Sequence, residues 1–137
     1  MSNDETKRDR LIARLSNEPE PQLVEIEAFF DGNDDLGSIG CNLLPHPGIE
    51  AFRSALFRIA ARPDVKGVYA QIFELDPGEG CWPFTDTILI VGDISSEDVQ
   101  RELASLEPDE VRKGEEFGLP EEYTNRLGGP ILVAWWD

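Results

Sequence analysis

The sequence has little of what small enzymes and secreted domains are commonly built around. It contains two cysteines, Cys41 and Cys81, and a single histidine, His46. Two cysteines are too few for a disulfide scaffold and are expected to be free thiols in a reducing compartment. No apolar run approaches the roughly 18 residues of a membrane-spanning helix, and residues 1–14 lack the charged-then-apolar pattern of a secretory leader. These absences predict a cytoplasmic protein of the bacterial type.

Basic residues are scarce as well. Twelve Lys and Arg stand against 28 Asp and Glu, which gives a formal net charge of −16. No Lys or Arg occurs between Arg14 and Arg53, or in residues 67–100, so charge is sorted along the chain. This charge argues against binding to the phosphate backbone of DNA or RNA, because such binding needs cations that displace counterions, and against anionic membranes. The partner that it favours is a basic protein.

The pattern of apolar residues predicts one α+β domain at residues 21–137, preceded by a helix and an acidic hinge at residues 1–20. After the hinge, the order of elements is strand, helix, strand, strand, helix, strand. This βαββαβ order is typical of the ferredoxin-like split βαβ sandwich, with its strands in the spatial order four, one, three, two. The expected elements are an N-terminal helix at residues 4–15, strands at residues 22–30, 67–75, 85–91 and 131–136, and helices that open at His46 and Ser95.

In that topology three acidic segments would leave the sheet at the same end. They are the loop after the first strand, the turn between the second and third strands, and the long connection into the fourth. Arg53, Arg58, Arg62 and Lys66 would lie toward the opposite end. Trp82 lies in the second segment and is the expected apolar anchor, because Trp is a preferred interface residue. The carboxylates expected to bind a basic partner are Asp34, Asp35, Asp76, Glu79, Glu115 and Glu116.

Two catalytic alternatives come from the loop at residues 31–46. Asp31, Asn33 and Asp35 place oxygen ligands at alternate positions, as calcium loops do. The EF-hand pattern then fails, because Leu36 stands where it needs glycine and Asn42 where it needs glutamate. The competing interpretation is that these residues form Asx turns facing solvent.

The second alternative pairs Cys41 as nucleophile with His46 as base, oriented by Asp35 or Asp86. Acidic surroundings would raise the pKa of the thiol and weaken it as a nucleophile. The competing interpretation is that Cys41 is a small packed residue and that His46 caps the helix that follows.

Several motifs together resemble an uncharacterised group of small acidic bacterial proteins, similar to immunity or toxin-neutralising proteins. The motifs are GNDDLGSIGCN, HPG, Arg62-Pro63-Asp64-Val65, WPFTDT and the terminal WWD. The resemblance implies no catalytic residue. We therefore expect a non-catalytic domain that inhibits a basic protein, such as a nuclease or another nucleic-acid-binding protein. No cofactor is expected. The alternatives are a metal-assisted enzyme with its site in the loop at residues 31–46, and a structural or oligomerisation module.

Overall fold

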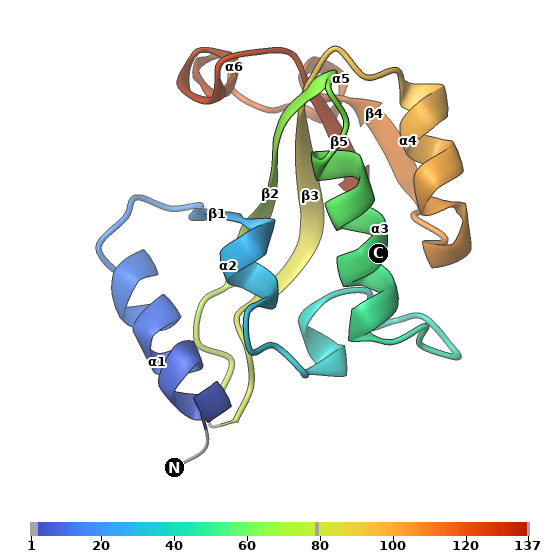
Figure 1. Ribbon diagram of the computed structural model, residues 1–137. Helices are drawn as coiled ribbons and strands as arrows, with labels where there is room; N and C mark the ends of the chain where they lie inside the picture. Colours follow the sequence, from blue (N-terminus) through green and yellow to red (C-terminus); the bar gives the residue numbers. More distant parts are fainter. Residues whose placement is uncertain (1–2, 79, 137) are drawn as a thin grey trace.

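The described strands form one antiparallel sheet in the order β1-β2-β3-β5-β4 (Figure 1). The structure is a computed structural model that describes residues 3–78 and 80–136. Its strands are β1 Leu23–Glu25, β2 Val65–Glu74, β3 Phe84–Gly92, β4 Glu110–Lys113 and β5 Ile131–Trp135. Its helices are α1 Asn3–Leu15, α2 Ile26–Phe30, α3 Ile49–Ala60, α4 Ser96–Leu103, α5 Gly114–Phe117 and α6 Glu122–Leu127, with 3-10 turns η1 Leu36–Ser38 and η2 Ala104–Leu106.

The helices cover the two faces of the sheet unequally. Helices α2, α3 and α4 share the main core with the strand residues that point to one face. On the other face, a smaller cluster joins Leu89 and Val133 to Tyr123 of α6, with Phe117 of α5 packed against it. Successive strand residues point to opposite faces, which is why one strand serves both clusters. The predicted α+β sandwich with an additional N-terminal helix is confirmed.

The first predicted strand is shorter than expected. Only Leu23–Glu25 is extended, and Ile26–Phe30 forms α2. Ile26, Phe29 and Phe30 are buried, at the i, i+3, i+4 spacing that puts three side chains on one side of a helix. In a strand over residues 22–30, one side would be fully apolar, with Val24, Ile26, Ala28 and Phe30. Both periods therefore fit the segment, and burial against α3 accompanies the helical one.

The predicted spatial order of the strands is wrong. The first strand was expected in the middle of the sheet, but β1 lies at an edge and pairs only with β2 among the described strands. A three-residue strand offers too few hydrogen bonds for a central position, and an edge place needs pairing on one side only. At the other edge lies β4, in a stretch for which the sequence predicts no strand.

The two ends of the sheet carry different loops and helices. The turn between β2 and β3, residues 75–83, and the loop at residues 31–48 lie at one end, which we call the hairpin end (Figure 1). At the opposite end lie α5, α6 and the turn between β3 and α4. The register agrees, since Val91 of β3 pairs with Ile131 and Lys113 pairs with Leu132 there.

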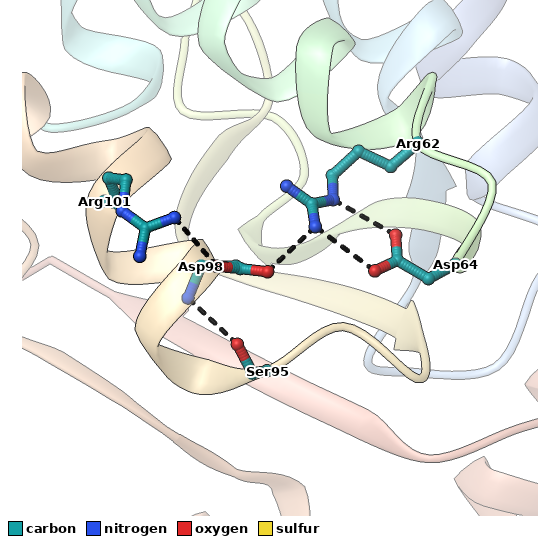
Figure 2. Close-up of polar contacts among 5 residues, drawn as sticks. All are labelled: Arg62, Asp64, Ser95, Asp98 and Arg101. Atoms are coloured by element: carbon teal, nitrogen blue, oxygen red, sulfur yellow. Dashed lines mark hydrogen bonds and ion pairs between the residues drawn. The ribbon is translucent and has the colours of Figure 1, made fainter.

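An ion-pair network ties α3 to α4 (Figure 2). Arg62, just after α3, donates to both carboxylate oxygens of Asp64 at 3.0 and 3.2 Å, and to Asp98 of α4 at 2.8 Å. Asp98 also accepts from Arg101 at 2.9 Å, and its amide donates to Ser95 Oγ, the predicted cap of α4, at 3.1 Å. The hydrogen bonds from Arg62 lower the pKa of Asp64 below its ordinary value. These contacts pair two carboxylates with two bases, so these four charges are neutralised inside the fold.

Candidate functional site

Two of the three predicted acidic segments meet at the hairpin end. The backbone amide of Trp82 donates to Asp35 Oδ2 at 3.0 Å, which joins the loop at residues 31–48 to the turn between β2 and β3. Asp34 and Asp35 are therefore brought to the same end of the molecule as Asp76. Glu79, also predicted to bind the partner, lies outside the described residues.

The carboxylate of Asp35 has a structural role. Its Oδ1 accepts from the amide of Gly37 at 2.9 Å, which caps η1, while Oδ2 accepts from Trp82. Asn33 is buried, with its Oδ1 accepting from the amide of Asp35 and its Nδ2 donating to Ser38 Oγ, both at 2.9 Å. These contacts are of the Asx-turn kind. Asp34 is exposed and has no hydrogen-bond or ion-pair partner among the described residues.

Helix α1 supplies basic groups to this end, a contact that is not predicted from the sequence. Lys7 Nζ lies 2.8 Å from Asp31 Oδ1. Arg8 Nη2 lies 2.7 Å from Asp76 Oδ1 and also donates to the carbonyl of Gly78. The available signal was that every base before Arg53 lies in the predicted N-terminal helix, so the nearest countercharge for the following acidic segment was already in that helix.

The apolar part of the site differs from the prediction. Trp82 is only 4 % exposed and belongs to the main core, so the predicted role of an exposed anchor is wrong. Among the described residues, the large hydrophobic side chains that are exposed are Leu36 at 52 %, Leu44 at 95 % and Phe73 at 74 %. Leu36 and Leu44 lie in the loop at residues 31–48, and Phe73 lies near the end of β2, against Phe84 with ring centroids 5.8 Å apart.

The carboxylates predicted to bind a partner from the third acidic segment lie at the opposite end, so the predicted meeting of all three segments is wrong. Glu115 and Glu116 are in α5, at the end opposite to the turn between β2 and β3 (Figure 1). The reason is β4, which carries the chain along the edge of the sheet to that end before α5 begins. Glu115 lines a cleft of about 730 Å³ there, together with Asp93, Glu121 and Lys113. Lys66, whose Nζ donates to the carbonyl of Gly128, makes this end mixed in charge.

The residues of the proposed metal loop already have protein partners. Asp31 pairs with Lys7, while Asn33 and Asp35 accept hydrogen bonds from backbone amides within the loop. Across residues 3–78 and 80–136, no group of three or more His, Cys, Asp and Glu side chains is placed so that it could hold a metal ion.

The proposed Cys–His pair is not assembled either. The Nε2 atom of His46 lies 2.8 Å from the carbonyl of Ile39, and its Nδ1 accepts from the amide of Gly48 at 2.9 Å. Because Nδ1 is an acceptor, the proton of the neutral ring is on Nε2, which donates to Ile39. Both ring nitrogens are thus engaged by the backbone, and Cys41 is an exposed thiol. Asp86, one of the two acids expected to orient His46, accepts a hydrogen bond from Thr87 Oγ1 at 2.8 Å.

Within the part of the chain that the structure describes, none of the helices has the length and apolar character needed to cross a bilayer.

Comparison with known proteins relates the chain to one bacterial family. A sequence model of the Uncharacterized protein YfbO family matches residues 6–127. The chain is 32 % identical over 124 residues to the Uncharacterized protein YfbO of Escherichia coli (strain K12), an alignment that covers 87 % of this chain and 84 % of that protein. No solved structure matches. On the strength of the family match and this identity, the chain belongs to the YfbO family.

Proposed function

We propose that the protein is a non-catalytic binding domain that docks a basic protein through its hairpin end, in the manner of an immunity or antitoxin-like inhibitor. One observation carries the proposal. The exposed large hydrophobic side chains Leu36, Leu44 and Phe73 lie in or beside the two acidic segments that meet there. Apolar groups beside unpaired charge are typical of a protein-binding surface, since the first supply buried area and the second select the partner. The proposal keeps the cytoplasmic location expected from the sequence.

The carboxylates most readily available to a partner are those without a partner inside the fold. Asp34 and Glu74 are exposed and have no ion-pair or hydrogen-bond partner among the described residues. Glu74 follows the exposed Phe73 in β2, and Asp34 precedes the loop residue Leu36 by two positions. Charges at the rim of an interface raise the association rate and make it depend on salt, whereas apolar contacts govern dissociation.

A second copy of this chain is a less favourable occupant of the same surface. Each copy carries a formal net charge of −16, so like-charge repulsion opposes pairing of two hairpin ends. A partner of opposite charge gains from the same field. An oligomerisation module would therefore be expected to associate more strongly as salt is raised, and a receptor for a basic protein more weakly.

The experiment is affinity capture of a partner, followed by binding measurements with both proteins purified. The test variant is Asp34→Lys combined with Glu74→Lys. The control is Glu121→Lys combined with Glu122→Lys, which makes the same charge change at the opposite end, at exposed positions. We expect the first pair to weaken binding at least about tenfold, or ~1.4 kcal/mol, and the second pair to weaken it far less.

Equal losses for the two double variants would mean that only net charge matters, and the proposal of a defined docking end would then be wrong. Raising NaCl from about 50 to about 300 mM should also weaken binding, because the Debye length falls below the separation of surface charges. An affinity that does not change with salt would contradict the electrostatic part of the proposal.

A further inference from the structure

Besides Asp9 of its own helix, whose Oδ1 lies 3.1 Å from Nη1, the guanidinium of Arg8 has three acceptors at the hairpin end. The acceptors are the carboxylate of Asp76, 2.7 Å from Nη2, the carbonyl of Gly78, 2.9 Å from Nη2, and the carbonyl of Cys81, 2.5 Å from Nε. We call these three acceptors the arginine cradle. The side chain of Arg8 is only 13 % exposed there. Because two of the acceptors are backbone carbonyls with fixed directions, the three together match the planar fork of a guanidinium better than the point charge of an ammonium group.

The helix that carries Arg8 is attached by a small number of side chains. Its backbone makes few close contacts with the other described helices and strands. Its apolar contacts come from the buried Leu11 and Leu15. Two further ion pairs, Lys7 with Asp31 and Arg14 with Glu25, hold it in place. A hinge at residues 17–21, with two prolines, separates the helix from β1. A helix held in this way can be exchanged for another ligand at lower cost than a central element of the sheet.

The helix is also chemically like the partner proposed above. The bases of residues 1–52 all lie in α1, and two of them, Lys7 and Arg8, pair with carboxylates of the acidic segments at the hairpin end. In the free protein, α1 thus provides at this end the kind of group that a basic protein would bring.

We propose that the arginine cradle is the contact point for an arginine of the basic partner, and that Arg8 occupies it until that partner binds. This inference rests on the proposed docking function and adds a required side chain on the partner. It also makes α1 an internal competitor. A ligand that needs the empty cradle binds with an apparent association constant equal to its intrinsic constant multiplied by the fraction of molecules in which the cradle is empty. Removal of Arg8 should consequently strengthen binding. The gain should exceed what a change of one unit in net charge explains.

The test compares Arg8→Ala with Arg10→Ala. Both variants remove one positive charge from the same helix, but Arg10 is exposed and has no ion-pair partner among the described residues. The probes are fluorescein-labelled hexa-arginine and hexa-lysine, measured by fluorescence anisotropy at about 50 mM NaCl. We expect Arg8→Ala to bind hexa-arginine at least about tenfold more tightly than Arg10→Ala does. For hexa-lysine the two variants should agree within about threefold, because an ammonium group gains little from the cradle.

Two further variants separate the cradle from the folding of α1. Asp76→Asn introduced into the Arg8→Ala protein removes the charge of the cradle and should cancel the gain for hexa-arginine. Arg8→Lys keeps the charge of the helix but not the fork, and should show a smaller gain than Arg8→Ala. Circular dichroism and thermal melts establish that each variant is folded. Because the core leucines of α1 are unchanged, any shift in Tm for Arg8→Ala also reports how strongly the cradle holds this helix.

The outcomes distinguish the two proposals. If Arg8→Ala and Arg10→Ala bind hexa-arginine equally, the cradle is not a partner site. In that case, weaker binding of hexa-arginine by the Asp34→Lys, Glu74→Lys protein would leave docking at the hairpin end standing. If that double variant also binds as the wild type does, both proposals are wrong.

Discussion

The substitution Gly92→Ala should be among the most damaging changes of a single methyl group in this protein. Gly92 ends β3 with φ of +145°, a conformation that residues with a Cβ rarely adopt. A Cβ at this position would lie 2.2 Å from the carbonyl oxygen of Asp64 and 2.8 Å from Cα of Val65. Both are backbone atoms, so no side-chain rotation can relieve the overlap.

The magnitude follows from two separable terms. Placing alanine in a conformation that favours glycine costs about 1–3 kcal/mol. Relief of the overlap requires β2 and β3 to separate where Asp93 donates its amide to the carbonyl of Asp64 at 2.9 Å, which adds the loss of at least one backbone hydrogen bond, about 0.5–1.5 kcal/mol. The expected loss in free energy of unfolding is about 2–4 kcal/mol.

Gly118→Ala provides the matched control. Gly118 follows α5 with φ of +91°, but a Cβ there would meet no atom within 4 Å. It should lose only the conformational term, partly offset by about 0.4–1 kcal/mol because alanine restricts the unfolded chain. Urea denaturation followed by circular dichroism measures both. If Gly92→Ala costs no more than Gly118→Ala, the argument from backbone overlap is refuted.

Three further predictions concern single contacts. Trp136→Phe removes the Nε1 hydrogen bond to the carbonyl of Leu106, 2.8 Å long and buried, and should cost about 1–3 kcal/mol in urea denaturation; a cost near zero would show that water replaces the indole. Glu25 has a pKa below its ordinary value, first because Arg14 of α1 donates hydrogen bonds to its carboxylate. The ionised carboxylate therefore stabilises the fold above about pH 4.3, and this stabilisation is lost as the pH falls through the lower pKa of the folded state. Glu25→Gln should therefore lose less stability than the wild type between about pH 7 and pH 3, and equal losses in the two proteins would contradict the stated direction of the pKa shift. Asp35→Ala should cost about 2 kcal/mol or more, because two backbone amides lose a charged acceptor, whereas Asp34→Ala should stay within about 0.5 kcal/mol; thermal melts that rank the two neighbours the other way would reverse their assigned roles.

The elements that the sequence predicts well are those with one clear periodicity. Apolar spacing and turn residues predict two core helices that open at His46 and Ser95, and these helices begin at Ile49 and Ser96. The same signals predict strands β2, β3 and β5. The segment at residues 26–30 was predicted as strand because it fits both periods, and only tertiary contact decides between them. Strand β4 contains one apolar residue, Val111, among three charged ones, so it carries almost no signal of its own.

The hairpin end was predicted only in part, for a physical reason. A loop that follows an edge strand and a turn between adjacent antiparallel strands are positioned by local connections, so their meeting survives an error in strand order. The place of Glu115 and Glu116 depends on the whole path of the chain after α4, including β4, and that path was not visible in the spacing of residues. The docking of Arg8 depends on the direction in which α1 leaves its hinge, which no local pattern encodes.

A net charge is a poor guide to where a partner binds, because a fold uses much of its charge internally. In this protein, Asp64 and Asp98 hold two helices together through Arg62, and Asp35 binds backbone amides. Such carboxylates cannot change partners without loss of structure. Asp34 and Glu74 differ, since they have no partner among the described residues and their neighbours include exposed apolar side chains. Asp76 is intermediate, because its partner Arg8 belongs to the loosely attached helix α1. The distinction that matters for recognition is thus between carboxylates that hold the core of the fold together and carboxylates that a partner can reach, and net charge does not separate the two.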